Sequence, residues 1–219
     1  MRWYPDPIGR FPERPFYEND ELDRDCETII TEFLMARRGK VAFPIDTNDL
    51  VVLLEQETAD LDLYADLSAD GPDKEGKTIF SSRGKPKVQI SAALQEPRRE
   101  NRLRTTLAHE LGHVKFHNYL YGLYPGRPSP CCSGHTIIGA SASDWLEWQA
   151  GHCSVSFLMP LRALRRTVRE AKKEAGVVAE PSIGSTVGQM VIWLVQDKYR
   201  VSADAARVRL LRADFLTEP

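Results

Sequence analysis

Two histidines and a glutamate fall within five residues of one another, in the segment His109-Glu110-Leu111-Gly112-His113. On a helix, residues four apart lie on one face with Cβ atoms about 5 to 6 Å apart. His109 and His113 can therefore direct imidazole nitrogens at one zinc ion. Glu110 is turned by one helical step from His109, beside the metal, where it can take a proton from zinc-bound water. The spacing predicts two ligands and one base for metal-dependent hydrolysis.

A catalytic zinc ion requires a third protein ligand and an open position. His117 follows four residues after His113, but on a straight helix it lies roughly 12 Å along the axis from His109, too far to share the metal. Three candidates lie farther along the chain: Glu147, Asp144 and His152. Each could project from a second helix that crosses the first, and the residues alone do not rank them.

Hydrophobic periodicity predicts the elements that must position these side chains. Helices are expected at residues 20–38, 46–55, 97–117, 144–158, 161–173, 187–199 and 202–215. Short strands at residues 61–65, 78–80 and 87–90 are separated by Gly, Pro and Asp and predict a small antiparallel sheet. Gly112 lies inside a predicted helix, where it costs up to about 1 kcal/mol relative to Ala. It therefore predicts close approach by another element.

Two further segments are irregular. Residues 1–19 are rich in proline and aromatic side chains, which predicts an extended arm lying against the body of the protein. Residues 121–143 form a predicted loop rich in Pro, Gly and Ser that carries the adjacent Cys131 and Cys132. These two are interpreted as loop thiols. With His135 they could bind a soft metal, but no fourth ligand is visible in that stretch.

Composition limits the functional classes. The chain has 219 residues, a net charge of −2, 42% hydrophobic and 27% charged residues. The near-neutral charge argues against broad coating of nucleic acid. No apolar run reaches the roughly 18 to 20 residues of a membrane span, and the first residues do not read as a signal peptide. With four cysteines, too few for a disulfide scaffold, we expect a cytoplasmic protein.

Two helical motifs carry a resemblance to a known family. Residues 104–113 place Arg-Thr-Thr-Leu-Ala before His-Glu-Leu-Gly-His, and two downstream segments read Glu147-Trp148-Gln149-Ala150 and Phe157-Leu158-Met159-Pro160. Pro44-Ile45-Asp46 and residues 199–210 fit the same pattern. Over about residues 20–215 the chain resembles the ImmA/IrrE family of metallopeptidases. The resemblance implies zinc held by His109, His113 and Glu147, with Glu110 as the base.

The resemblance also implies a fold and an activity. The expected fold class is α+β, a mainly helical zincin-like metallopeptidase with a small three-stranded sheet and a C-terminal helical region. We divide the chain into an arm (1–19), a peptidase domain (20–160) and the C-terminal region (161–219). The implied activity is intracellular, zinc-dependent cleavage of a specific regulatory protein, such as a helix-turn-helix repressor encoded nearby. The oxyanion-stabilising residue is left open among four candidates: His117, Tyr119, Tyr121 and His152.

The C-terminal helices suggest a different class of protein. Residues 187–199 and 202–211 have the cadence of a helix-turn-helix, with Arg207, Arg209 and Arg212 on the second helix. The alternative is thus a DNA-binding, toxin–antitoxin or phage-related regulator with a structural zinc ion and no proteolysis. Packing of the two helices against the rest of the chain is the favoured interpretation, since such cadences are common in helical proteins. Nucleic acid is accordingly the less favoured partner.

Overall fold

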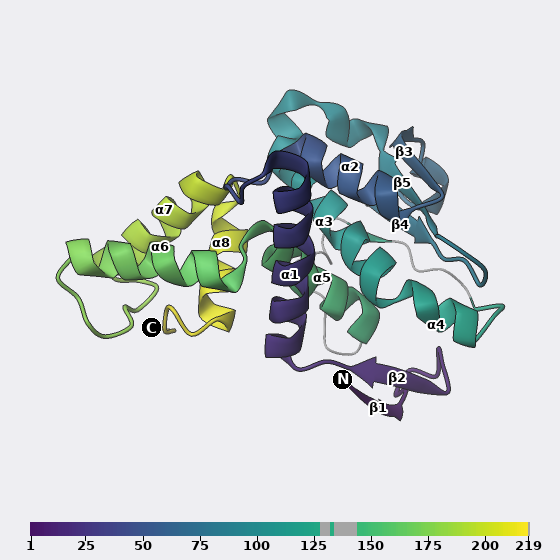
Figure 1. Cartoon of the computed structure of the whole chain (residues 1–219), viewed down its shortest axis with the longest axis horizontal. Helices are drawn as coiled ribbons and strands as arrows, with labels where there is room; N and C mark the ends of the chain where they lie inside the picture. The colour runs from purple at the N-terminus through teal and green to yellow at the C-terminus, as the bar shows by residue number, and fades with distance from the viewer. Residues whose placement is uncertain (128–131, 134–143, 219) are drawn as a thin grey trace. The chain divides into compact units, whose positions relative to one another are not determined.

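The computed structural model describes residues 1–127, 132–133 and 144–218 (Figure 1). The chain forms two compact units. Unit 1 comprises Met1–Leu22 and Asp46–Ser154, and unit 2 comprises Asp23–Ile45 and Val155–Pro219. These units do not follow the expected boundaries at residues 19 and 160. Most of the first long helix groups with the C-terminal helices, although a hundred residues separate them in the sequence.

The sheet of unit 1 has the strand order β3-β5-β4-β6. Its strands are β3 (Asp60–Ala65), β4 (Lys74–Ile79), β5 (Lys87–Ser91) and the two-residue β6 (Cys132–Ser133). β4 pairs antiparallel with β5 and β6, as expected, but β3 and β5 are parallel. The prediction of a mainly helical α+β fold with a small sheet built on these three strands is confirmed, but the predicted antiparallel arrangement is wrong for the β3–β5 pair. Alternating hydrophobicity marks the buried face of a strand and carries no information about the direction of its neighbour.

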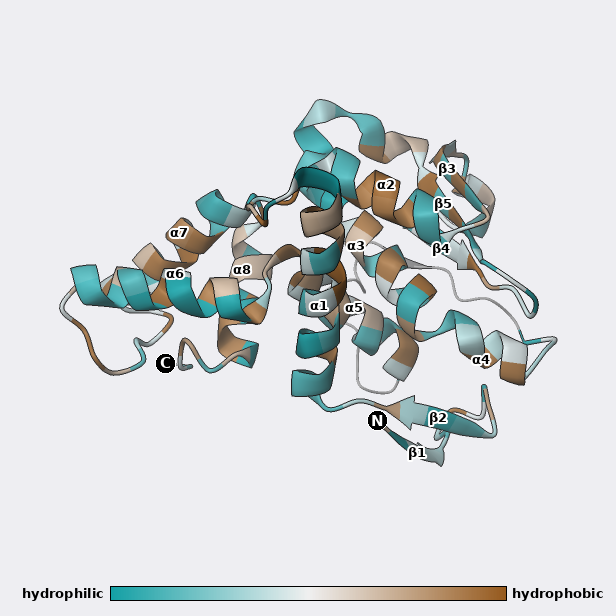
Figure 2. Ribbon diagram, viewed as in Figure 1, coloured by the Kyte–Doolittle hydropathy of each residue, from teal (hydrophilic) through white to brown (hydrophobic). Residues whose placement is uncertain are grey.

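Helix α3 (Glu100–Phe116) is the central helix of unit 1 and makes contacts with α2 (Thr47–Glu57) and β4. Every residue of α3 from Leu103 to Val114 is buried. The 3-10 turns η1 (Ser68–Asp70), η2 (Ala92–Gln95) and η3 (Pro97–Arg99) precede α3. In Figure 2 α2 has a hydrophobic middle and hydrophilic ends. The buried stretch of α3 differs, because it includes charged and polar residues. Buried polar groups require polar partners. The polar side chains of α3 must therefore contact other polar groups inside unit 1, which suggests a function for this helix besides packing.

The end of α3 leads directly into the short helix α4 (Asn118–Leu123), which contains Tyr121. The expected loop therefore begins later than residue 121. Cys131 and His135 lie outside the described residues, as does most of that loop. The next helix, α5 (Trp145–Leu158), begins where the sequence predicts, and its residues through Ser154 belong to unit 1.

The amino-terminal arm is a hairpin of β1 (Arg2–Pro5) and β2 (Glu13–Phe16), paired antiparallel. The tip of the hairpin packs into unit 1 through Phe11, which is 2% exposed. Its cluster contains apolar side chains from α4 and α5: Leu120, Tyr121, Trp145 and Leu146. The aromatic residues of the arm thus form part of a hydrophobic core, in agreement with the expectation that the arm lies against the body.

Unit 2 contains most of α1 (Asn19–Arg38) together with α6 (Leu161–Glu174), α7 (Thr186–Tyr199) and α8 (Ala203–Arg212). α8 ends before Phe215, earlier than predicted. Arg209 of α8 is 1% exposed and donates hydrogen bonds to Asp23 Oδ1 at 2.7 Å and to the Met159 carbonyl at 3.2 Å. Arg209 is consequently an internal cation of unit 2 and does not face solvent.

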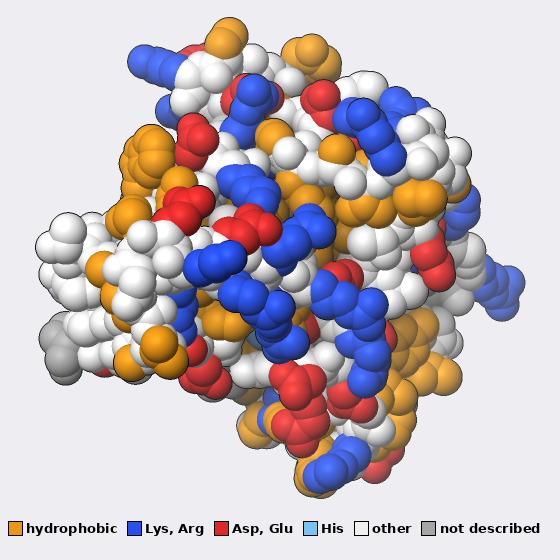
Figure 3. All heavy atoms as spheres, turned by 60° about the vertical axis from the view of Figure 1, so that its left-hand side comes forward, with side chains coloured by type: hydrophobic (Ala, Val, Ile, Leu, Met, Phe, Trp, Pro, Cys, Tyr) orange, Lys and Arg blue, Asp and Glu red, His pale blue; other side chains and the backbone are white. Residues whose placement is uncertain are grey.

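Helix α6 has one apolar side and one strongly basic side. Leu164, Val168 and Ala171 are buried, while Arg165 and Arg169 are exposed. α6 is hydrophilic over most of its length in Figure 2. In the view of Figure 3, Lys and Arg side chains lie next to Asp and Glu side chains. In the described part of the chain, none of the helices combines the length and the apolar character needed to cross a bilayer.

Candidate metal centre

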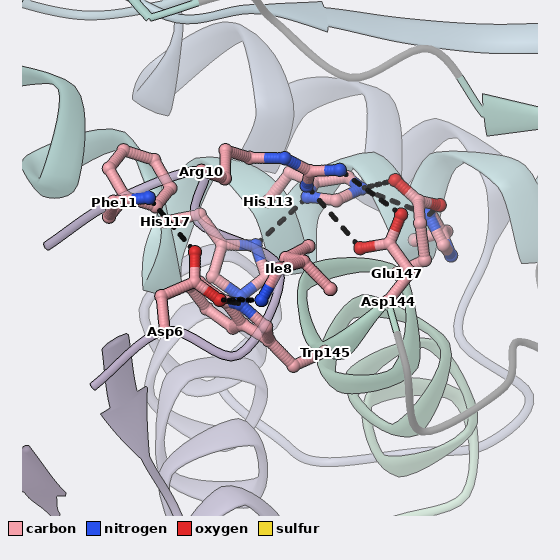
Figure 4. Close-up of polar contacts among 10 residues, drawn as sticks. Asp6, Ile8, Arg10, Phe11, His113, His117, Asp144, Trp145 and Glu147 are labelled. Atoms are coloured by element: carbon pink, nitrogen blue, oxygen red, sulfur yellow. Dashed lines mark hydrogen bonds and ion pairs between the residues drawn. The ribbon is translucent and has the colours of Figure 1, made fainter. Parts of the chain in front are cut away.

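Three potential metal ligands converge in the interior of unit 1. α3 supplies His109 and His113, and the first turn of α5 supplies Glu147. The ligand atoms of the three side chains all lie within 4.8 Å of one another. The Nε2 atoms of His109 and His113 are 3.1 Å apart, and the Glu147 oxygens lie 3.2 and 3.3 Å from them. Figure 4 shows Glu147 directed at His113.

The donor set fits a zinc ion. Two imidazole nitrogens and one carboxylate match the ligands of catalytic zinc sites, which keep a fourth position for water or substrate. Both Glu147 oxygens are buried, and among the described residues the polar groups that they face are the nitrogens of His109 and His113. Burying an ionised carboxylate in this way is costly unless a cation compensates it. The arrangement therefore has the geometry and the charge of a site for a divalent cation.

The structure separates Glu147 from the other two candidates for third ligand. Asp144 forms an ion pair with Arg10 at 3.3 Å, as Figure 4 shows. The ring of His152 stacks on Trp148, with centroids 5.6 Å apart and an interplanar angle of 29°. Among the described residues, the metal-compatible cluster contains only His109, His113 and Glu147.

The ligands shift one another's pKa values. Burial raises the pKa of the Glu147 carboxyl, but His113 and His109 outweigh burial and hold that pKa well below its ordinary value. Burial lowers the pKa of His113, but the charge and hydrogen bond of Glu147 outweigh it and give a net raised pKa. The two imidazoles therefore stabilise the negative charge of Glu147, and Glu147 stabilises positive charge on His113.

Metal affinity should accordingly fall as the pH falls through the raised pKa of His113. A ligand must be deprotonated to bind metal, so below that pKa a proton on His113 competes with zinc, and above it the competition disappears. Where one proton is displaced, the expected change is about tenfold in affinity per pH unit. Competition titrations of zinc against a chelator between pH 6 and 8 measure it. An affinity that does not change over this range would contradict the raised pKa of His113.

Glu110 lies beside these ligands and is fully buried. Its Oε2 accepts a hydrogen bond from the Thr78 hydroxyl at 2.5 Å, whereas Oε1 has no hydrogen-bond partner among the residues that the structure describes. A Cβ atom built on Gly76 would lie 2.5 Å from Oε1. A side chain therefore does not fit at this position of β4, and the backbone of the strand lies directly beside the carboxylate. The sequence did not single out Thr78 or Gly76. A glycine inside a strand signals close approach of another group, but only the register of the sheet identifies that group as Glu110.

The four candidates for oxyanion stabiliser are placed differently. His117 Nδ1 lies 2.9 Å from His113 Nδ1, and the Tyr119 hydroxyl lies 3.3 Å from the Tyr17 hydroxyl. Tyr121 stacks on Phe80 with centroids 4.1 Å apart, and burial raises the pKa of Tyr121 to about 12. None of these contacts selects an oxyanion stabiliser. His117 instead contacts His113, one of the three potential metal ligands. Burial and the adjacent His113 hold the pKa of His117 well below its ordinary value, so the His117 ring is neutral.

Gly112 allows α3 and α5 to approach closely, as its presence in a helix predicts. A Cβ atom there would lie 3.0 Å from Cys153 Cβ and 3.2 Å from Ala150 Cα. Gly112→Ala should therefore destabilise the protein by about 1 to 3 kcal/mol through overpacking, partly offset by a gain of about 1 kcal/mol in helix propensity. It should also weaken zinc binding, because α5 carries Glu147. Urea unfolding and zinc titration of the variant measure both effects, and a more stable variant with parental affinity would contradict this account.

Two histidines and a glutamate on one buried helix, with a carboxylate from a second helix, form the arrangement expected of a metallopeptidase-type domain. A family model described as the IrrE N-terminal-like domain, Peptidase_M78, matches residues 68–211. The chain belongs to this metallopeptidase family, which confirms the resemblance found in the two helical motifs. Comparison with curated proteins gives no match.

Proposed function

We propose that this protein is an intracellular zinc-dependent endopeptidase that cleaves a specific regulatory protein, such as a helix-turn-helix repressor. The observation that carries the proposal is the convergence of His109, His113 and Glu147 beside the buried carboxylate of Glu110. These residues would hold one zinc ion. When bound, zinc supplies Lewis-acid activation of water and of the scissile carbonyl.

Glu110 acts as the general base in this proposal. The Thr78 hydroxyl occupies its Oε2, which leaves Oε1 to accept a proton from the attacking water. The same carboxyl group can then donate that proton to the nitrogen of the leaving amine. Thr78 also fixes the rotation of the carboxylate, so that the proton-accepting oxygen is held in one place. Such positioning contributes to the rate because the base needs no reorganisation during the reaction.

The surroundings of Glu110 suit a peptide substrate. β4 runs past the carboxylate, with Gly76 and Thr78 adjacent to it. A polar cavity of about 430 Å³ lies at the start of β4, lined by Lys74, Glu75 and Arg102 among others. The lining of this cavity does not include Glu110, so the cavity would receive a substrate side chain away from the bond that is cut. The identity of the substrate as a repressor rests on the family resemblance.

The test is incubation of the zinc-loaded protein with the helix-turn-helix protein encoded next to it. We expect one discrete cut, mapped by mass spectrometry, and one zinc ion per chain. His109→Ala should lose the zinc ion and the cut together, whereas Glu110→Gln should lose only the cut. Equal cleavage by the parent and Glu110→Gln would overturn the proposal, and so would a parent that binds no zinc.

One argument for the DNA-binding alternative, the row of arginines on α8, is weakened by the position of Arg209. Of the arginines on α8 that could enter a groove, Arg209 is buried and paired with Asp23, while Arg207 is exposed. Burial and the neighbouring Arg209 lower the pKa of Arg212, which is only partly exposed. A recognition helix needs several side chains that reach base edges. Steeply salt-dependent binding to duplex DNA that Arg207→Ala abolishes would be required to restore this alternative.

A further inference from the structure

A chain of buried hydrogen bonds leads from the metal ligand His113 to the amino-terminal arm. His113 Nδ1 lies 2.9 Å from His117 Nδ1, and His117 Nε2 lies 3.0 Å from Gln149 Oε1. Gln149 Nε2 donates to the carbonyl oxygen of Pro15 at 3.1 Å. His113, His117 and Gln149 are all 2% exposed or less. We call these three side chains and the Pro15 carbonyl the relay.

The Pro15 carbonyl determines the direction of every bond in the relay. A carbonyl oxygen can only accept, so the amide nitrogen of Gln149 faces Pro15 and its oxygen faces His117. A neutral His117 must then donate from Nε2 to Gln149 and accept at Nδ1. His113 consequently carries its proton on Nδ1. Its Nε2 therefore carries no proton, and Nε2 is the atom that faces His109 and Glu147.

The arm also supports the relay from a second side. The Trp145 ring meets the ring of His117 edge to face, with centroids 5.9 Å apart. The indole nitrogen of Trp145 donates to Asp6 Oδ1 at 2.9 Å, and Asp6 Oδ2 accepts from the Phe11 backbone at 2.9 Å. Figure 4 shows this group, with Asp6 and Trp145 next to His117. His109 differs, because its Nδ1 is buried without a hydrogen-bond partner among the described residues.

We propose that His117 and Gln149 are positioning residues through which the amino-terminal arm fixes the tautomer and the orientation of His113 for metal binding. Partners that orient a metal-bound histidine raise its basicity and restrict its rotation. The arm lies outside residues 68–211, the part that matches the family model. The metal centre of this chain therefore extends into a segment that the family match does not include.

The test measures zinc affinity by competition with a chelator, without any substrate. His117→Phe keeps an aromatic ring but cannot accept from His113, and Gln149→Met keeps the length of the side chain but forms no hydrogen bonds. Each should lose roughly 10- to 100-fold in zinc affinity. His117→Gln retains one acceptor and one donor and should recover most of it. Leu53→Ala, a core truncation on α2 (3% exposed), controls for a general loss of stability.

Two measurements distinguish a loss of His113 positioning from a general loss of protein stability. Long-range ¹H–¹⁵N spectra of the metal-free protein, recorded at a pH at which the His113 ring is neutral, should show the Nδ1–H tautomer of His113 in the parent and lose that preference in His117→Phe. Zinc should slow amide hydrogen exchange in residues 13–17 of the parent but not of Gln149→Met. Parental affinity in both relay variants would overturn the inference, and so would an equal loss in Leu53→Ala.

The inference rests on the metal-binding half of the proposed function and not on cleavage. If the parent binds no zinc, the proposed function itself fails. If the parent binds zinc and the relay variants bind it equally well, only the positioning role fails.

Discussion

Replacing Glu110 with Gln should lower the rate of substrate cleavage by about 10²- to 10⁴-fold, the usual contribution of a general base. The amide cannot accept a proton from water at neutral pH, so the hydrolytic step loses its base. Its carbonyl oxygen can still accept the hydrogen bond that Thr78 donates to Oε2. The side chain is nearly the same size, so the fold and the three metal ligands should be unaffected. Single-turnover cleavage and zinc content, measured on the same preparation, test both parts.

The matched control is Glu100→Gln. Glu100 lies on the same helix α3, but at its exposed first turn, where it accepts a hydrogen bond from Thr47. The same change of charge there should leave the cleavage rate close to that of the parent. If Glu100→Gln and Glu110→Gln were impaired equally, the effect would come from the charge of α3, and the general-base role of Glu110 would be wrong.

Replacing Asp23 with Ala should destabilise the protein by about 3 to 5 kcal/mol, the usual cost of leaving one member of a buried ion pair unpaired. Asp23 Oδ1 accepts from Arg209 at 2.7 Å and from the Ser156 hydroxyl at 2.6 Å. The side chains of Asp23 and Arg209 are 7% and 1% exposed. Without Asp23, the guanidinium would lie in the interior of unit 2 without its counter-charge. Urea unfolding followed by circular dichroism measures the loss.

Asp25→Ala provides the comparison on the same helix. Asp25 pairs with Arg24 at 3.7 Å, and the side chains of Arg24 and Asp25 are 65% and 47% exposed. Exposed pairs of this kind contribute about 0 to 1 kcal/mol, so Asp25→Ala should unfold almost as the parent does. Similar unfolding midpoints for Asp23→Ala and Asp25→Ala would show that the buried pair contributes little to stability.

The sequence predicted those parts of the structure that depend on local spacing. The two histidines at positions i and i+4 define two ligands and place Glu110 beside them, because a helix has a fixed geometry. The long helices were also predictable, since each buries one periodic face. Gly112 predicted a close contact because glycine otherwise weakens a helix. The contact with Ala150 and Cys153 is the physical reason for its presence.

Other parts could not be predicted because they depend on the tertiary arrangement. The residues alone did not decide between Glu147 and its alternatives Asp144 and His152 as the third ligand, and only the crossing of α5 over α3 separates them. Thr78 and Gln149 are ordinary polar residues in the sequence, and their hydrogen bonds join segments 32 and 134 residues apart. For Arg209, the sequence suggested a contact that the structure does not support. A cationic side chain on a terminal helix suggested contact with DNA, but its partner lies 186 residues away in the chain.

The close packing of α5 on α3 has a thermodynamic consequence. The same short stretch of α5 carries the carboxylate of Glu147, the amide of Gln149 and the backbone that rests on Gly112. A ligand that binds only the folded state stabilises it, by about 2.7 kcal/mol when its free concentration is 100 times Kd. A metal ion joining these two helices would therefore act as a removable cross-link. The melting temperature of the protein should rise with the concentration of free metal, and a chelator should lower it before any substrate is present.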